Sequence, residues 1–124
     1  DIYQDAVEQL KAWQQQGILL YVYSSGSVYA QKLLFAHTEF GDLTVLFSDY
    51  FDTRIGGKKE TASYQRIAEN IALLPEQLLF LSDIKEELDA AKLAGFNTIQ
   101  LVRDEHIDPN ATHVQVNNFA QIQF

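Results

Sequence analysis

The chain has 124 residues, a length that suits one domain with a single buried core. Nine basic and seventeen acidic side chains give a formal charge of −8, which opposes binding to phosphate backbones and argues against a nucleic-acid partner. Hydrophobic residues make up 47% of the chain, as in globular domains, yet no apolar run is long enough to span a bilayer. We therefore expect one globular domain over residues 1–124, with neither nucleic acid nor membrane as a partner.

Two missing residue types bear on compartment and completeness. Cysteine is absent, which excludes disulfides and thiolate metal sites and favours a reducing compartment, so we predict a cytoplasmic protein. The opening residues DIYQDAVEQL lack the basic and apolar regions of a secretory signal. Methionine is also absent, although a primary translation product begins with one. We expect the chain to be processed or to be part of a longer protein.

The first half of the chain predicts a helix, a strand and a second helix. Apolar residues at helical spacing predict a helix over 2–16, and Gly17 stands where a helix ends in a positive-φ residue. The wholly apolar and aromatic run 18–23 predicts a fully buried parallel strand that a serine- and glycine-containing loop terminates. A second helix is expected over 28–37. Beyond it the periodicity is short, and a helix at 43–47 and a strand at 50–51 both remain open.

The second half alternates helices and strands. In chain order we predict a loop at 56–59, a helix through Tyr64 and Ile71 that ends before Pro75, a strand at 78–83, a helix at 84–95, a strand at 97–102, an edge strand at 113–116 and a short amphipathic tail at 119–124. This alternation implies right-handed crossovers and an α/β fold, a Rossmann-like parallel sheet with helices on both faces. In such sheets ligands bind beyond the carboxyl ends of the strands.

Polar residues follow the predicted strands at the edge where ligands bind. The loop Ser24–Ser27 offers hydroxyls and, through Gly26, close approach of backbone N–H groups at a helix N-terminus. It could form an anion site, or its serines could simply cap the helix. Lys58 follows two glycines, and its ammonium could neutralise charge that develops during phosphoryl transfer, or it could be an ordinary solvated lysine.

The acidic residues near 83–87 are candidate metal ligands. Asp83 ends a predicted strand, where a carboxylate suits Mg²⁺, although it could equally cap the following helix. Glu87 lies four residues later on the same helix face and could reach the site or be a surface charge. The histidines His37, His106 and His113 show neither metal-ligand spacing nor a serine–histidine–acid pattern, so we expect them to be structural or exposed.

Three segments together resemble motifs of a known superfamily. They are YVYSSGSVYAQKLLF (Tyr21 to Phe35), YFDTRIGGKKETASY (Tyr50 to Tyr64) and LFLSDIKEELDAAKLAGF (Leu79 to Phe96). These segments resemble the second, third and fourth motifs of the haloacid dehalogenase superfamily, in the form that enolase-phosphatases use, and the string SSGS-x-x-AQKLLF is specific to the latter. The resemblance covers Tyr3 to about Val102. It implies that Ser24, Ser25 and Gly26 bind the substrate phosphate, that Lys58 is the catalytic motif lysine, and that Asp83 binds magnesium.

The resemblance also implies an activity and a gap in the chain. Such enzymes use Mg²⁺ to act on 2,3-diketo-5-methylthiopentyl 1-phosphate in methionine salvage, combining enolisation with phosphate hydrolysis through an aspartyl-phosphate. The first motif, an aspartate followed two residues later by another acid, has no counterpart here, and neither does the cap domain. Asp49 and Asp52 follow the serine motif and are not taken as the nucleophile. We expect the central nucleophile strand of a haloacid dehalogenase-like core to be missing, so that 18–23 and 78–83 do not pair.

Two other functions remain open. A receiver domain also combines aspartate, hydroxyl, lysine and Mg²⁺, but it has its acids first and its lysine late, opposite to the order here. A non-catalytic remnant of the fold could bind a phosphate ligand or a protein partner. If the first interpretation holds, the partners are a small phosphorylated substrate and a missing N-terminal segment, or another chain, that completes the sheet.

Overall fold

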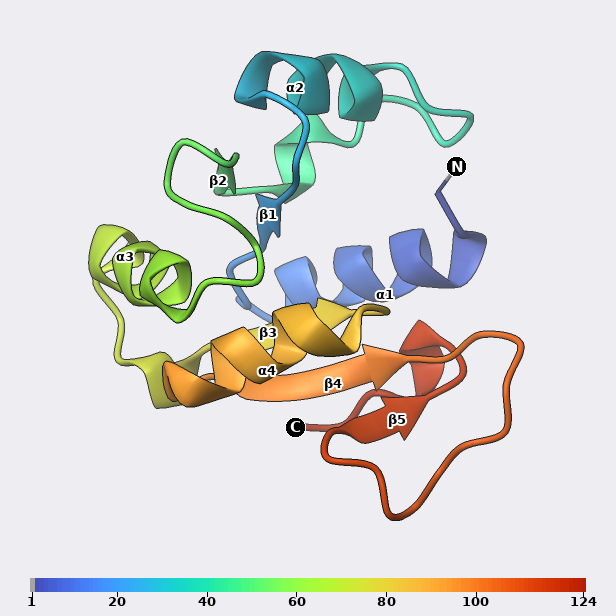
Figure 1. Ribbon diagram of the computed structural model, residues 1–124. Helices are drawn as coiled ribbons and strands as arrows, with labels where there is room; N and C mark the ends of the chain where they lie inside the picture. Colours follow the sequence, from blue (N-terminus) through green and yellow to red (C-terminus); the bar gives the residue numbers. More distant parts are fainter. Residues whose placement is uncertain (1) are drawn as a thin grey trace. The chain divides into compact units, whose positions relative to one another are not determined.

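A computed structural model describes residues 2–124 (Figure 1). The architecture is α/β, with four α-helices and strands that all pair in parallel, which confirms the predicted fold class. The chain divides between Arg54 and Ile55 into two compact units. The assignment of the whole chain to one domain stays a prediction.

The first unit contains two helices and a two-stranded parallel sheet. Its elements are α1 (Gln4–Gln15), β1 (Tyr21–Tyr23), α2 (Val28–Ala36), a 3₁₀ helix (Thr44–Leu46) and β2 (Asp49–Phe51). Both options left open for 38–55 are confirmed, because the 3₁₀ helix and β2 occupy that stretch. Gly17 has φ +86°, as the end of α1 requires. Within the sheet Tyr21 lies opposite Asp49 and Tyr23 opposite Phe51.

The prediction of a fully buried strand over 18–23 was wrong in length and in burial. Only Tyr21–Tyr23 forms the strand, and all three residues are half-buried. Ile18 is drawn into the end of α1, because its backbone N–H donates to the Trp13 carbonyl at 3.0 Å. Leu20, at 8% exposure, is the buried residue of the run although it precedes β1.

Aromatic rings form much of the core of the first unit. The ring centroids of Phe35 and Phe47 lie 4.8 Å apart, and those of Phe47 and Tyr50 lie 5.6 Å apart in an edge-on contact. Leu43 and Leu46 are buried around the same 3₁₀ helix. Such aromatic pairs add to the free energy gained by burial alone.

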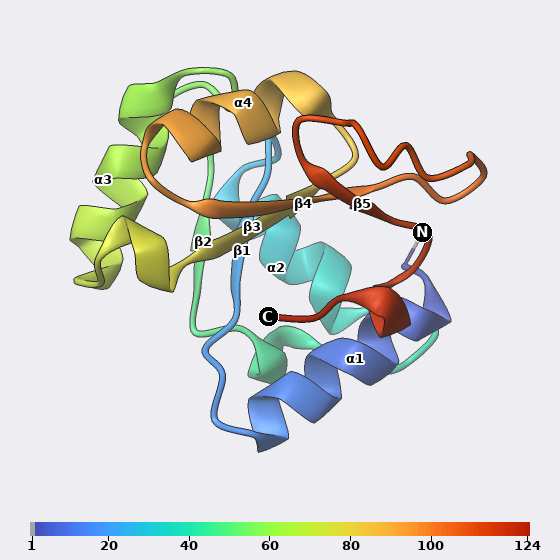
Figure 2. The same cartoon turned by 90° about the horizontal axis from the view of Figure 1, so that it is seen from below.

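The second unit contains a three-stranded parallel sheet. Its elements are α3 (Thr61–Ile71), a 3₁₀ helix (Pro75–Gln77), β3 (Leu79–Ser82), α4 (Lys85–Leu93), β4 (Asn97–Leu101), β5 (Val114–Val116) and a 3₁₀ helix (Phe119–Gln121). The strand order is β3-β4-β5, so the predicted edge strand is confirmed as β5. Helix α4 packs on β3 and β4 and contacts α3 (Figures 1 and 2).

A buried histidine ties β5 to the rest of this unit. His113 accepts or donates through Nδ1 with the Thr98 hydroxyl and through Nε2 with an Asp89 carboxylate oxygen, each at 2.7 Å. The residue is 2% exposed, whereas His37 and His106 are exposed. The prediction that the histidines are structural or exposed is therefore confirmed.

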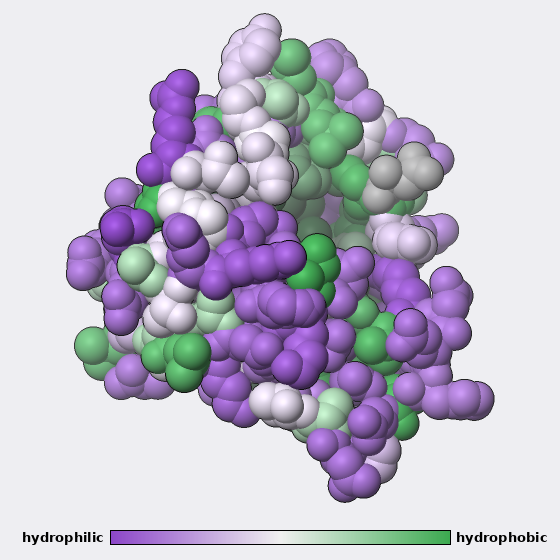
Figure 3. Space-filling view, in the orientation of Figure 1, coloured by the Kyte–Doolittle hydropathy of each residue, from purple (hydrophilic) through white to green (hydrophobic). Residues whose placement is uncertain are grey.

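The two sheets do not share a strand pair. Among residues 2–124, β1 pairs with β2 and β3 pairs with β4, and no backbone pairing joins 18–23 to 78–83. That a strand is missing between the two segments stays a prediction. Hydrophilic residues predominate on the face that Figure 3 shows, in keeping with the formal charge of −8. No helix within residues 2–124 is long and apolar enough to cross a membrane.

Candidate functional site

The loop between β1 and α2 is held by hydrogen bonds at several points. The Ser24 backbone N–H donates to the Phe51 carbonyl at 3.1 Å, and the Gly26 N–H donates to the Ser24 hydroxyl at 3.2 Å. The Ser27 hydroxyl accepts from the Ala30 N–H at 3.1 Å, so the helix-cap role is confirmed for Ser27. The Ser24 hydroxyl stabilises the loop by accepting the hydrogen bond from Gly26.

Ser25 differs from the other serines of this loop. It is exposed, and neither its hydroxyl nor its backbone N–H has a hydrogen-bond partner among residues 2–124. The Ser27 backbone N–H is likewise without a partner in that part of the chain. Unpaired donors at the start of α2, where the helix dipole favours negative charge, are what a bound phosphate group requires.

Two buried polar residues, one in α2 and one directly after β2, support the loop. Gln31 donates from Nε2 to the Gly26 carbonyl at 2.8 Å and to the Phe51 carbonyl at 2.9 Å. Asp52, 8% exposed, accepts the Val28 N–H at 3.3 Å, which places its carboxylate at the first residue of α2. Asp52 therefore acts here as a hydrogen-bond acceptor at the start of α2. This role agrees with the expectation that Asp52 is not the nucleophile.

Lys58 and Glu87 form a largely buried ion pair in the second unit. The Lys58 ammonium lies 3.1 Å from a Glu87 carboxylate oxygen, and the two side chains are 22% and 6% exposed. The same carboxylate oxygen accepts the Ser82 hydroxyl at 3.0 Å. The alternatives of a solvated lysine at 58 and a surface acid at 87 were thus wrong, because the two residues neutralise each other at the end of β3.

The main chain around Lys58 is fixed by the first turn of α3. The Ser63 hydroxyl donates to the Gly57 carbonyl at 2.7 Å, and the Tyr64 hydroxyl donates to the Lys58 carbonyl. Ser63 and Tyr64 are both fully buried. The Tyr64 ring also makes edge-on contacts with Phe80 at 5.0 Å, which joins the lysine loop to β3.

Gly56 is the residue that lets this loop approach α3. Its φ is +136°, and a Cβ at this position would lie 2.2 Å from the Ser63 hydroxyl oxygen. Only glycine avoids both the backbone strain and the clash. The neighbouring Gly57 has no such restriction, since a Cβ there would meet Glu60 at an ordinary 3.4 Å.

Asp83 is exposed at the carboxyl end of β3. The alternative role as the cap of α4 was wrong, because the N-cap residue is Ile84 and no side chain caps the helix there. The Ile84 N–H donates to the Ser82 hydroxyl at 3.0 Å. Within residues 2–124 no group of three or more histidine and acidic side chains converges as a metal site. A single available carboxylate nevertheless suits Mg²⁺, which binds through one or two carboxylates together with waters and substrate phosphate oxygens.

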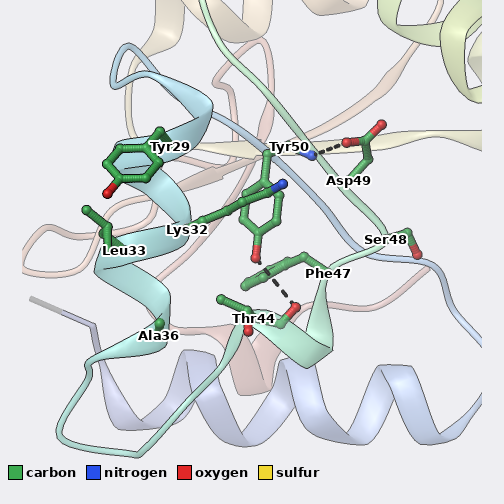
Figure 4. Close-up of a pocket in the computed structure, with 9 residues that line it drawn as sticks. All are labelled: Tyr29, Lys32, Leu33, Ala36, Thr44, Phe47, Ser48, Asp49 and Tyr50. Carbon is green, nitrogen blue, oxygen red and sulfur yellow. Dashed lines mark hydrogen bonds between the residues drawn. The ribbon is translucent and has the colours of Figure 1, made fainter.

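The first unit has a groove along α2 that includes none of Ser24–Ser27. It has a volume of about 570 Å³ and runs between Tyr29, Ala36 and the first half of β2 (Figure 4). The Lys32 ammonium lies 5.8 Å from the Tyr50 ring centroid there. Burial, with a smaller contribution from Asp42, raises the pKa of Tyr50. None of the donors of the serine loop lines this groove.

Known proteins resemble the chain over nearly its full length. Enolase-phosphatase E1 of Serratia proteamaculans is 60% identical over 121 residues, which are 98% of this chain and 52% of that protein. The chain resembles enolase-phosphatases from end to end. Enolase-phosphatase E1 of Yersinia enterocolitica is 57% identical over the same shares. The chain spans about half the length of these relatives, at 52% of each. No protein-family model matches it.

Solved structures agree with the fold. The UTR4 protein of Saccharomyces cerevisiae superposes with a TM-score of 0.82 at 35% identity, over 97% of this chain and 56% of that one. A phosphatase from Thermococcus onnurineus has a TM-score of 0.79 at 18% identity, over 95% of this chain and 54% of that one, and supports the fold alone. The predicted resemblance to enolase-phosphatases is therefore confirmed, and the predicted haloacid dehalogenase-like fold agrees with the solved structures.

The candidate residues are divided between the two units. Lys58 and Glu87 are brought together beside Ser82 in the second unit, where Asp83 also lies, whereas the serine loop belongs to the first. Gln31, which is buried and bonded to the Gly26 carbonyl of that loop, was not among the residues predicted from the sequence. The signal that could have revealed Gln31 is its polar side chain within the mostly apolar string VYAQKLLFA of α2. Lys32, the other strongly polar residue of that string, is exposed.

Proposed function

We propose that the chain is part of a cytoplasmic, Mg²⁺-dependent phosphatase and enolase that acts on 2,3-diketo-5-methylthiopentyl 1-phosphate in methionine salvage. Support comes from relatives named enolase-phosphatase at 55–60% identity. The relatives are named enolase-phosphatases, and a phosphatase from Thermococcus onnurineus shares the fold, which favours this function over a receiver domain. The substrate itself is proposed from the resemblance.

The observation that carries the proposal is the Lys58–Glu87 ion pair. A lysine side chain in a loop is normally mobile, but here the 3.1 Å contact with a buried carboxylate fixes where the ammonium lies. An ammonium has three N–H donors, so two remain for a phosphate oxygen after one is given to Glu87. Preorganised positive charge lowers the barrier to phosphoryl transfer because it need not be reoriented as the reaction proceeds.

The serine loop provides the phosphate-binding part of the proposal. Ser25 offers a hydroxyl and a backbone N–H with no partner among residues 2–124, and Gly26 lets the substrate approach the main chain closely. The Ser24 hydroxyl accepts the Gly26 N–H and keeps the loop in shape, and its own proton is available to a phosphate oxygen. Together these groups bind a phosphate without any cation from the first unit.

Asp83 is proposed as the magnesium ligand of this chain. Its carboxylate is exposed and adjoins the buried Ser82–Glu87 contact, so it can coordinate the ion without disturbing the ion pair. When bound, Mg²⁺ neutralises phosphate charge and orients the transferring group. Glu87 is the weaker candidate, since coordination would require it to give up Lys58. We propose that further carboxylate ligands come from outside this chain.

The attacking carboxylate is also proposed to lie outside residues 1–124. An aspartate there forms the aspartyl-phosphate, which divides one difficult displacement into two easier steps. The relatives are about twice as long as the chain, which covers 52% of each. This difference in length supports a further segment, or an equivalent partner chain, that carries the aspartate.

Magnesium dependence of the complete protein tests this function. We expect phosphate release from the diketo phosphate to require Mg²⁺ and to stop with a chelator. Asp83→Asn should raise the Mg²⁺ concentration for half-maximal rate by about tenfold or more, because one charged ligand is lost. Asp104→Asn, an acid on an exposed stretch, serves as the control. A chelator-insensitive rate would contradict the proposed Mg²⁺ dependence, and no turnover at all would favour a non-catalytic remnant.

A further inference from the structure

Gln31 carries a buried polar atom that the rest of the chain leaves unpaired. The residue is 3% exposed, and its side-chain oxygen Oε1 has no hydrogen-bond partner among residues 2–124. A buried acceptor without a partner costs free energy that an apolar side chain would not. The other residues of α2 include many apolar ones, so an amide at this position calls for an explanation.

The explanation lies in the two N–H groups of the same amide. Nε2 donates to the Gly26 carbonyl at 2.8 Å and to the Phe51 carbonyl at 2.9 Å. Both partners are acceptors, so the amide has one workable orientation. Turning it over would bring Oε1 against two carbonyl oxygens. The unpaired oxygen is the consequence of retaining both donors.

These two bonds fix the direction of the loop's main chain. In a planar trans peptide the C=O and the following N–H point in opposite directions. Because Gln31 holds the Gly26 carbonyl toward the buried amide, the N–H of Ser27 points away from it. That N–H has no partner among residues 2–124. The second bond ties the loop to the end of β2, where the Phe51 carbonyl also accepts the Ser24 N–H.

We infer that Gln31 is a positioning residue for phosphate binding. By holding the Gly26 carbonyl inward, it aims the Ser27 N–H at the phosphate oxygens and keeps Ser25 beside it. The inference rests on the proposed function for its substrate. Its physical content, an amide that orients an anion-binding loop, concerns residues 24–31 and can be measured with inorganic phosphate alone.

The test compares three variants of the complete protein. Gln31→Met removes the amide with little change in volume. Gln65→Met is a control that makes the same exchange at an exposed position of α3. Val7→Ala is a second control that lowers stability by removing buried side-chain atoms of α1. For Gln31→Met we expect the inhibition constant for inorganic phosphate and the KM to rise together by about tenfold, with kcat changed less. Both controls should keep the phosphate affinity of the wild type, although Val7→Ala should have a lower Tm.

A phosphate titration followed on the backbone amides separates this inference from the proposed function. We expect the Ser25 and Ser27 amide resonances of the wild-type protein to shift with phosphate, and the shifts to weaken in Gln31→Met. If these shifts are seen but the wild-type protein does not turn over the diketo phosphate, the inference is supported and the proposed function is contradicted. Unchanged phosphate affinity in Gln31→Met with a lowered Tm, or wild-type amides that do not respond, overturns it.

Discussion

Lys58 and Lys59 are neighbours in the sequence with different surroundings in the structure. Lys58 is paired with buried Glu87 at 3.1 Å, whereas Lys59 is exposed. In the complete protein we expect Lys58→Ala to lower kcat by about 100-fold or more, the scale of one lost charge-stabilising group. Lys59→Ala should change kcat little. Steady-state rates of phosphate release check this, and equal losses in both variants would show that the wrong lysine was assigned.

The residue types at the candidate site could be predicted from the sequence, but their partners could not. Ser24–Ser27, Lys58 and Asp83 follow strands or precede a helix, and such positions can be found from local patterns. The pairing of Lys58 with Glu87 joins residues 29 positions apart. Gln31 was missed for the same reason, since its two carbonyl partners belong to a loop and to β2.

Adjacent glycines in the lysine loop offer a matched pair of substitutions. Gly56→Ala combines a φ of +136° with a Cβ 2.2 Å from the Ser63 hydroxyl, whereas Gly57→Ala meets Glu60 at 3.4 Å. We expect Gly56→Ala to lower the free energy of unfolding by about 1–3 kcal/mol, the range for backbone strain at a non-glycine residue. Gly57→Ala should cost clearly less. Denaturant unfolding measures both, and equal costs would show that the loop relaxes freely.

At the scale of elements, helices were predicted more reliably than strand limits. The amphipathic pattern of α3 and the glycine after α1 are local signals, and both helices lie where expected. The run 18–23 was predicted too long, because an apolar run does not reveal that Ile18 bonds back to Trp13. Short strands depend on their neighbours for pairing, which local sequence does not encode.

The contact between Asp89 of α4 and His113, directly before β5, should make the stability of the fold sensitive to acid. A hydrogen bond from Lys85, and then one from His113, holds the pKa of Asp89 below its ordinary 3.8. Because the folded-state pKa is lowered, this stabilisation is fully present above pH 3.8 and is lost as the pH falls through the folded-state value.

Asp89→Asn tests that dependence. We expect the variant to have a lower Tm than the wild type near neutral pH and the difference to shrink as the pH falls below the ordinary pKa. Thermal unfolding from neutral pH to about pH 2 measures it. Glu86→Gln, an exposed acid on the same helix, is the control. A Tm difference that stays constant over this range would contradict the ionic role of Asp89.

At the scale of the whole molecule, the chain resembles about half of an enolase-phosphatase and includes no counterpart of the first motif. The remaining groups stabilise a transition state that needs an attacking carboxylate. We therefore expect the purified 124-residue chain to release no phosphate from any phosphomonoester. Turnover of a generic phosphate ester by this chain, abolished by a chelator, would contradict that expectation.

The central claim is that the phosphorylated aspartate lies outside residues 1–124. The most direct measurement is to quench the complete protein during turnover, reduce the acyl phosphate with borohydride, which converts the aspartate to homoserine, and locate the change by peptide mass spectrometry. We predict a single modified aspartate in a peptide outside the segment that corresponds to this chain. Modification at Asp49, Asp52 or any other acid of the present sequence would contradict the account.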